Sequence, residues 1–92
     1  MTVLLPGVLS QHAEGRHEVI LDLADDARVA SAVVALAERW PLLGTRLADE
    51  TGAVRRHVNL FVDGCDVRTT SGAQTRLTPG CVVHVLPSVA GG

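Results

Sequence analysis

The sequence predicts an α+β domain in which a small sheet packs against one main helix. Residues 57–62 alternate between two faces, as a half-buried strand does, and residues 29–40 carry apolar side chains at helical spacing. Strand and helix patterns follow one another in the order β, β, α, β, β, with no internal repeat and no linker. One amphipathic helix covers only one face of such a sheet, so we expect the other face to meet solvent or a partner.

Length and composition narrow the classes of function. A chain of 92 residues buries about 60–65% of its unfolded surface, which supports one core but leaves little room for a deep catalytic cleft. Hydrophobic residues make up 47% and charged residues 20%, as in soluble globular domains. The net charge of -2 argues against nucleic acid as a partner. No apolar run is long enough to span a bilayer and no basic region precedes the first apolar residues, so we expect a cytoplasmic protein with no membrane partner.

Two N-terminal segments predict strands. Residues 2–5 are apolar, and Pro6 and Gly7 then interrupt the pattern with a turn or a bulge. The polar residues 10–16 predict a loop, and residues 17–23 predict a second strand. The short connection favours an antiparallel hairpin.

The middle of the chain predicts a helix. Asp25 or Asp26 is expected to cap its N-terminus and to complement its dipole. Its buried face is expected to hold the apolar residues at helical spacing, which are Val29, Val33, Leu36, Ala37 and Trp40. Pro41 stops this helix, residues 42–48 can form a further helical turn, and residues 49–56 form a polar loop.

Strand and turn signals alternate through the rest of the chain. They predict a strand over 57–62, a turn at 63–64, a short strand over 65–68, a loop over 69–75, a turn at 78–80 and a last strand over 81–86. We expect Pro87 to end the pairing of the last strand, because proline has no N–H to donate.

The outer face of the predicted sheet is expected to present Phe61, His84 and Leu86. The core-facing residues of the same two strands are Val58, Leu60, Val62, Cys81, Val83 and Val85. Reversed strand parity would instead place Phe61 in the core, and His84 could be no more than a solvated strand residue.

The two cysteines are expected to be reduced thiols. Cys65 follows a predicted turn and is expected to be exposed, whereas Cys81 lies in an apolar run and is expected to be buried. Neither the cysteines nor the four histidines show a C-x-x-C or H-x-x-x-H spacing, so we predict no metal site.

The chain from Arg56 onward carries a family resemblance. The segments that carry it are HVNLFV at 57–62, DVR at 66–68 and VLPSVAGG at 85–92. Together with the order of the elements, they resemble the ubiquitin-like sulfur carrier proteins of the MoaD/ThiS family, and the chain looks most like the CysO subgroup, which carries sulfur for cysteine synthesis. The resemblance implies a ubiquitin-like β-grasp fold, a mixed sheet of four to five strands on one main helix. It also implies a domain over 1–87 and a free, flexible Gly-Gly tail over 88–92.

The resemblance implies a protein substrate rather than an enzyme. Gly92 is expected to be adenylated by an ATP-dependent activating enzyme of the MoeB/ThiF type and then converted to a thiocarboxylate. That group would pass its sulfur to a partner synthase, and the chain itself would bind no cofactor. The residues that the resemblance assigns are the tail, Val89, Ala90, Gly91 and Gly92, and a partner-binding face of Phe61, His84, Leu86 and Pro87. The departures from the family are Cys65 in the turn and the absence of lysine.

The residue types of the tail suit this chemistry. A terminal carboxyl group is ionised at neutral pH and can attack the α-phosphorus of ATP. Glycine has no Cβ, so Gly91 and Gly92 can pass through a narrow channel. Residues 88–92 reach at most about 17 Å when extended, which is enough to enter a buried site while the domain stays outside.

Two other functions stay open at this stage. Gly92 could be conjugated to lysines of target proteins, which would make the chain a protein modifier, or the chain could be a plain ubiquitin-like interaction domain with an inert tail. Among sulfur acceptors, cysteine synthesis is favoured, and molybdopterin, thiazole or a specialised thio-metabolite are alternatives. The absence of lysine fits a high-GC genome, and it also leaves no ε-amine for self-acylation.

Overall fold

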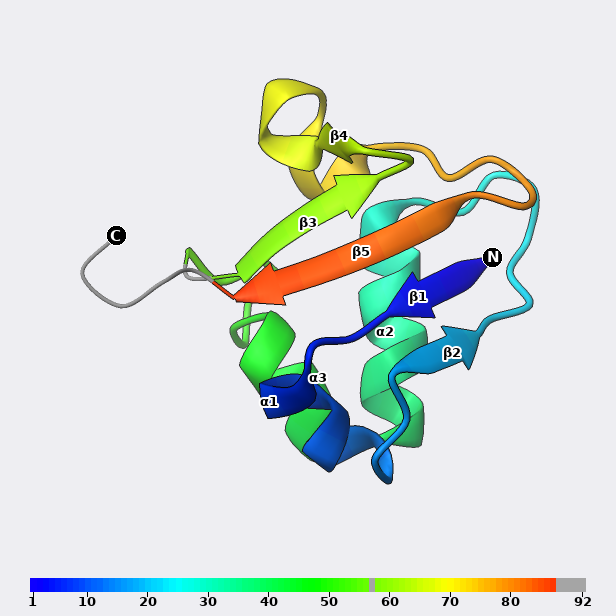
Figure 1. The fold of residues 1–92 in the computed structure, drawn as a ribbon. Coiled ribbons are helices and arrows are strands. Elements are labelled where there is room, and N and C mark those ends of the chain that lie inside the picture. The colour runs from blue at the N-terminus through cyan, green and yellow to red at the C-terminus, as the bar shows by residue number, and fades with distance from the viewer. Residues whose placement is uncertain (57, 88–92) are drawn as a thin grey trace.

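Five strands form one mixed sheet with the C-terminal strand at its centre (Figure 1). The computed structural model describes residues 1–56 and 58–87, the last of them for its backbone only. The strand order is β2-β1-β5-β3-β4, and β1 runs parallel to β5 while the other three pairs are antiparallel. The strands are β1 Thr2–Leu4, β2 Glu18–Ile20, β3 Val58–Val62, β4 Cys65–Asp66 and β5 Val82–Pro87. The predicted hairpin and the predicted mixed sheet are confirmed.

One main helix, α2 (Val29–Arg39), covers one face of the sheet, and a shorter helix, α3 (Pro41–Leu47), follows it (Figure 1). The predicted helical face is buried, with Ala37 half-buried and the other four side chains at most 8% exposed. These side chains pack against inward residues of the sheet, among them Val3, Val19, Leu60, Val83 and Val85. The alternation of strand residues and the helical period therefore meet in one core, as the patterns predict.

The segment after β1 is helical, which corrects the prediction of a turn and a loop. α1 spans Gly7–Ser10 and a 3-10 turn continues over Gln11–Ala13. Leu9 and Ala13 lie four residues apart and are both buried, and the Ser10 hydroxyl donates to the Gly7 carbonyl oxygen at 3.0 Å. The predicted loop over 10–16 is wrong at its start. Burial of the Leu9 and Ala13 side chains in the core stabilises a helical segment there, although the residues around them are polar.

Three strands are shorter than predicted, and the first is β1, which covers Thr2–Leu4 of the expected 2–5. β2 covers only Glu18–Ile20 of the expected 17–23, and β4 covers only Cys65–Asp66 of the expected 65–68. After β4 the carboxylate of Asp66 accepts a hydrogen bond from the backbone N–H of Arg68 at 2.9 Å, which turns the chain into a 3-10 turn. The expected loop over 69–75 contains a second such turn at Gly72–Gln74.

The start of α2 lies later than predicted, and its cap is Arg28 rather than Asp25 or Asp26. The backbone N–H of Arg28 donates to the Ser31 hydroxyl at 3.1 Å, and the N–H of Val29 donates to the Thr75 carbonyl oxygen at 2.9 Å. The carbonyl group of Thr75, 46 residues further along the chain, thus accepts from a backbone N–H that has no partner within the helix. Local sequence offered two acidic caps, but the tertiary contact decides where the helix begins.

Trp40 and Pro41 separate the two helices. Trp40 is 8% exposed, and its indole N–H donates to a carboxylate oxygen of Glu14 at 3.2 Å. Pro41 ends α2 as predicted and starts α3, where its missing N–H costs nothing. Gly44 of α3 lies so close to α2 that a Cβ on it would come within 2.3 Å of the Ala37 Cβ. The helices can cross this closely only because this position has no side chain.

Gly44→Ala is therefore expected to lower the free energy of unfolding by about 1–3 kcal/mol through overpacking. Urea titration followed by circular dichroism measures this loss. Ala37→Gly removes the nearer clash and leaves the one with the Ala37 Cα at 2.8 Å, so the double variant should lose less than the sum of the single variants. Gly7→Ala is the matched control, since nothing lies within 4 Å of a Cβ there. Equal losses from Gly44→Ala with and without Ala37→Gly would contradict the crossing described here.

Candidate functional site

The structure fixes where the predicted tail leaves the domain. β5 continues through Pro87, one residue beyond the predicted end, and Pro87 is the register partner of Val58 on β3. The predicted site residues Val89, Ala90, Gly91 and Gly92 lie outside the described residues. The side chain of Pro87 also lies outside the described residues. That Pro87 ends the pairing of the last strand stays a prediction.

The outer face of the sheet carries three of the predicted partner-binding side chains. Phe61 on β3 is the direct cross-strand partner of His84 on β5, and Leu86 lies two residues further along β5 on the same face. His84 is exposed, Phe61 is half-buried and Leu86 is 36% exposed. The predicted parity of both strands is confirmed, and the alternative that places Phe61 in the core is wrong. The role of these residues in binding stays a prediction.

A shallow groove of about 540 Å³ runs along this face. It is lined by Phe61, Asp63, Gly64, Val82, His84 and Leu86. Val82 and Leu86 count among the exposed large hydrophobic residues, and both flank His84 on its own strand. A mostly apolar groove with one imidazole and one carboxylate suits a protein surface as its partner.

Asp63 is a residue of this face whose role the sequence did not predict beyond a turn. It adopts a left-handed conformation with φ of 49°, followed by Gly64 with φ of 88°, which is the geometry of a tight hairpin turn between β3 and β4. Its backbone N–H donates to the Val82 carbonyl oxygen at 2.9 Å, and its carboxylate accepts from the Val82 N–H at 2.9 Å. The Asp-Gly pair was the available signal, but it does not show that the side chain also holds the start of β5.

The two thiols differ in surroundings, as predicted. Cys65 is exposed on β4, and Cys81 is buried just before β5. Burial raises the pKa of the Cys81 thiol above its ordinary value, and the negative charge of Asp63 raises it further. The Cys81 thiol therefore stays protonated at neutral pH and is a poor nucleophile. No cluster of three or more His, Cys, Asp or Glu side chains that could hold a metal ion occurs in the described part of the chain.

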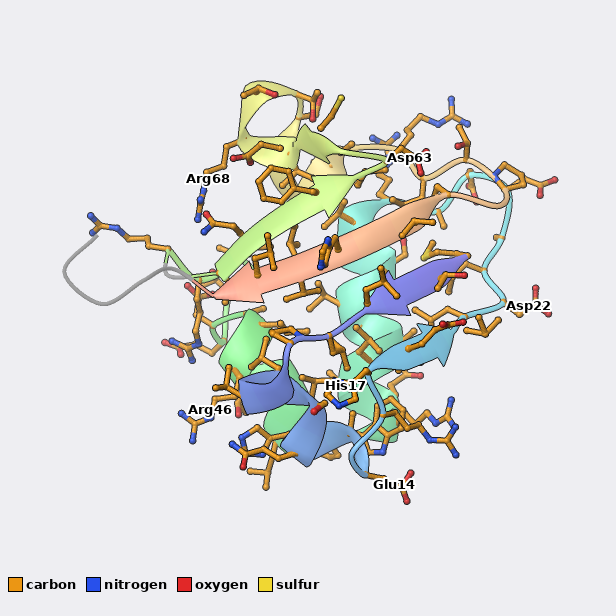
Figure 2. All side chains as sticks on the ribbon, viewed as in Figure 1. Glu14, His17, Asp22, Arg46, Asp63 and Arg68 are labelled. Carbon is orange, nitrogen blue, oxygen red and sulfur yellow. The ribbon has the colours of Figure 1, made fainter. Side chains whose placement is uncertain are left out.

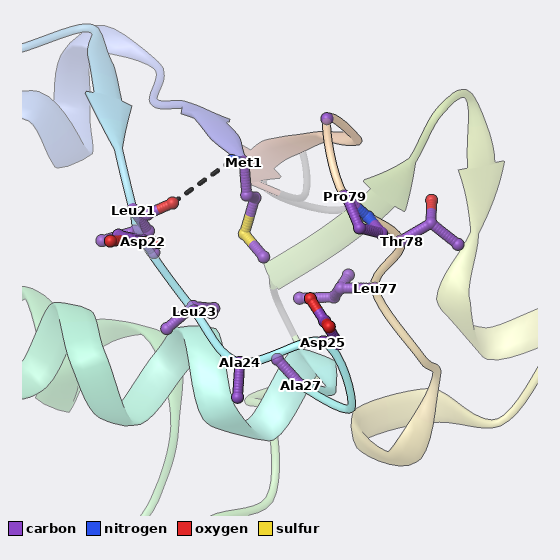
Figure 3. A pocket seen from close by; sticks show the side chains of 11 residues that line it. Met1, Leu21, Asp22, Leu23, Ala24, Asp25, Ala27, Leu77, Thr78 and Pro79 are labelled. Carbon is purple, nitrogen blue, oxygen red and sulfur yellow. Dashed lines mark hydrogen bonds between the residues drawn. The ribbon is translucent and has the colours of Figure 1, made fainter.

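A small cavity of about 210 Å³ lies at the other end of the sheet (Figure 3). Met1, Leu21, Asp22, Asp25 and Thr78 are among its lining residues, and the N-terminal ammonium group donates to the Leu21 carbonyl oxygen at 3.2 Å (Figure 3). Because β1 is parallel to β5 and Thr2 pairs with Val82, this cavity lies beside the start of β5 and not beside its end at Pro87. It shares no lining residue with the groove.

No helix among the described residues is long and apolar enough to cross a lipid bilayer.

Comparisons with known proteins agree with this geometry along the whole chain. The ThiS family matches residues 3–92. The sulfur carrier protein CysO of Mycobacterium tuberculosis is 32% identical over 94 residues, which cover 100% of this chain and 98% of that protein. The small archaeal modifier protein 3 of Haloferax volcanii is 35% identical over 78 residues, which cover 85% of this chain and 84% of that protein. A chain of the Amycolatopsis orientalis BexX/CysO complex superposes with a TM-score of 0.87 at 30% identity, covering 99% of this chain and 98% of that one.

The fold is thus a ubiquitin-like β-grasp, with a mixed sheet of five strands on one main helix. The chain belongs to the ThiS family.

The contrast between the thiols gives a prediction for labelling. In the native protein, a disulfide reagent should modify Cys65 at a rate within about tenfold of a free thiol and Cys81 at least about 100-fold more slowly. Cys65→Ser and Cys81→Ala isolate the two reactions, and denaturant should make the two rates equal. Fast native labelling of Cys65→Ser would contradict the burial of Cys81.

The raised pKa of the Cys81 thiol also predicts how the free energy of unfolding changes with pH. A thiol whose folded pKa lies above its unfolded pKa stabilises the fold fully below the unfolded value, and this contribution is lost as the pH rises through the folded value. The free energy of unfolding should therefore fall more steeply above the ordinary thiol pKa in the wild type than in Cys81→Ala.

Proposed function

We propose that this chain is a sulfur carrier protein and that Gly92 is its reactive residue. The observation that carries the proposal is the match to the ThiS family over 3–92, which extends to the terminal glycine pair. The relative named sulfur carrier protein CysO supports it, because its similarity covers the entire chain. On this proposal the chain is the substrate of other enzymes and catalyses nothing itself.

The proposed chemistry has two steps. A carboxylate oxygen of Gly92 attacks the α-phosphorus of ATP on an activating enzyme of the MoeB/ThiF type, which forms an acyl-adenylate and releases pyrophosphate. The sulfur of a sulfide ion then attacks the acyl carbon, and AMP leaves with the bonding electron pair. The product is a thiocarboxylate on Gly92, which is more nucleophilic than the carboxylate. The ATP is bound by the enzyme, so the chain needs no cofactor of its own.

The groove and the tail have separate roles in this proposal. The groove residues Phe61, His84 and Leu86, with Pro87 at the end of the strand, form the face that docks on the activating enzyme and later on the sulfur-accepting synthase. Val89, Ala90 and Gly91 connect that face to Gly92 and enter the active site of each enzyme in turn. Glycine at both terminal positions keeps the reacting end narrow enough to approach the catalytic groups of two different enzymes.

The sulfur acceptor is expected to serve cysteine synthesis. The CysO likeness over the full chain supports this acceptor above molybdopterin, thiazole or a specialised thio-metabolite. Incubation of the thiocarboxylate form with a cysteine-synthase-type enzyme and its amino-acid substrate should transfer the C-terminal sulfur.

Intact-mass analysis tests the reactive residue. When the chain is co-expressed with its activating enzyme, its mass should increase by the difference between sulfur and oxygen. Deletion of Gly92 should abolish this increase while circular dichroism shows an unchanged fold, because residues 88–92 follow the last strand. An unchanged wild-type mass with several activating enzymes, or loading of the deletion variant, would contradict the proposal.

Substitutions in the groove test the docking face. Phe61→Ala combined with Leu86→Ala should raise the KM of the activating enzyme for this chain about tenfold or more, because both side chains lie at the centre of the face. Ile20→Ala is the matched control, since Ile20 is 62% exposed on the edge strand β2. If Ile20→Ala raises KM as much as the groove variant does, the docking face is wrongly placed.

The relative named small archaeal modifier protein 3 supports a second candidate function, conjugation of Gly92 to amines of target proteins. Activation by adenylation is common to both functions, but the acceptor of the acyl group differs. A ladder of higher-mass conjugates that disappears on deletion of Gly92 favours the modifier. Thiocarboxylate without conjugates favours the carrier.

A further inference from the structure

In the described part of the chain, only part of the β3 edge that faces away from β5 is covered by another strand. β4 lies at that edge of the sheet but pairs only with Phe61 and Val62. The main-chain groups of Val58, the first residue of β3, therefore have no neighbouring strand on this side among the described residues. Main-chain groups at an open edge need other partners, because an unpaired carbonyl near the core is costly and an unpaired strand edge is easily displaced.

The side chain of Arg68 supplies those partners (Figure 2). Its Nη2 group donates to the carbonyl oxygens of Arg56 and Val58, each at 2.8 Å, and its Nη1 group donates to the side-chain oxygen of Asn59. The 3-10 turn Val67–Thr69 carries Arg68 to this position, and the hydrogen bond from its own N–H to Asp66 fixes that turn. The planar guanidinium group carries several N–H donors in a fixed arrangement, so it can donate to all three acceptors. An ammonium group cannot contact them with the same geometry.

The same residues of β3 border the root of the tail. Val58 is the register partner of Pro87, the last described residue of β5. Pro87 has no N–H to donate, and the N–H of Val58 donates to the Arg55 carbonyl oxygen at 3.0 Å. The N–H of Asp63 donates to the Val82 carbonyl oxygen, so the alternation along this antiparallel ladder makes Val58 and Pro87 a non-hydrogen-bonded pair. The main-chain groups of Val58 therefore point to the opposite edge of β3, where Arg68 donates to the Val58 carbonyl oxygen.

We propose that Arg68 is a positioning residue for the C-terminal tail. By fixing the start of β3, it fixes the strand against which Pro87 lies and so the direction in which the chain leaves the sheet. This inference rests on the proposed function, because the direction of departure matters only if the tail must enter an active site. A fixed point of departure increases the fraction of bound molecules in which the Gly92 carboxylate lies in line with the α-phosphorus of ATP. Loss of this positioning should therefore lower kcat more than it raises KM.

A matched control exists at another part of the molecule. Arg28 also donates from its guanidinium group to a main-chain carbonyl oxygen, that of Gln74 at 3.0 Å, and it is exposed as Arg68 is. Its contact lies at the start of α2, against the segment that precedes β5. Arg28→Gln and Arg68→Gln therefore change the same charge and the same kind of hydrogen bond, but only Arg68→Gln affects the root of the tail.

The kinetic experiment compares ATP-dependent loading of the wild type, Arg68→Gln, Arg68→Lys and Arg28→Gln at a temperature at which all are folded. Arg68→Gln is expected to lower kcat about tenfold while KM changes by less than about threefold, and Arg68→Lys should fall between it and the wild type. Arg28→Gln should stay within about twofold of the wild type. The proposal is overturned if Arg68→Gln loads at the wild-type kcat, or if Arg28→Gln loses as much. If Arg68→Gln does not fold, Arg68→Lys decides the question: a kcat below that of the wild type supports the proposal, and a wild-type kcat overturns it.

Amide hydrogen exchange tests the same proposal without any enzyme. Arg68→Gln should speed exchange at Asn59 and Leu86, the ladder pair next to the root, by about tenfold or more, whereas Arg28→Gln should leave both amides as in the wild type. Unchanged exchange in Arg68→Gln overturns the positioning role. Absence of loading in the wild type is a separate result, because it overturns the proposed function and leaves the exchange measurement to decide the role of Arg68.

Discussion

The pairing of β5 with β1 on one side and β3 on the other is the interaction on which the rest of this structure depends. It places the last strand of the chain at the centre of the sheet. Val83 and Val85 anchor that strand in the core, where each stabilises the fold by about 1.5–3 kcal/mol relative to exposure. The alternate side chains, Val82, His84 and Leu86, must then lie on the outer face. One strand therefore supplies the centre of the core, the centre of the exposed face and the root of the tail.

The arrangement of the sheet separates the core of this small domain from its exposed face. The core lies between the sheet and α2. The exposed face can be used for docking without removing any core contact, because its side chains point away from α2. The Asp63 side chain accepts from the main chain at the start of β5, and the Arg68 side chain donates to the main chain of β3 opposite the end of β5.

Most of the framework could be predicted from local pattern. The alternation of residues 58–62 and the period of α2 each report which side of an element is buried, because a strand or helix must place its apolar side chains on one face. The errors lie where a distant segment intervenes. Thr75 moves the start of α2 past Asp25 and Asp26, and burial of Leu9 and Ala13 makes a helix of a polar segment.

The sequence by itself determined the β-grasp class, the residues of the exposed face and the glycine pair that supports a carrier function, since each depends on the order and spacing of residue types. Only the tertiary structure decided that Arg68 contacts Arg56 together with Val58 and Asn59 of β3, and that Val58 lies opposite Pro87. The segment 66–68 was recognisable in the sequence, but its partner was not. The physical reason is that hydrogen bonds across an open strand edge join residues about ten positions apart through a turn whose shape depends on the whole sheet.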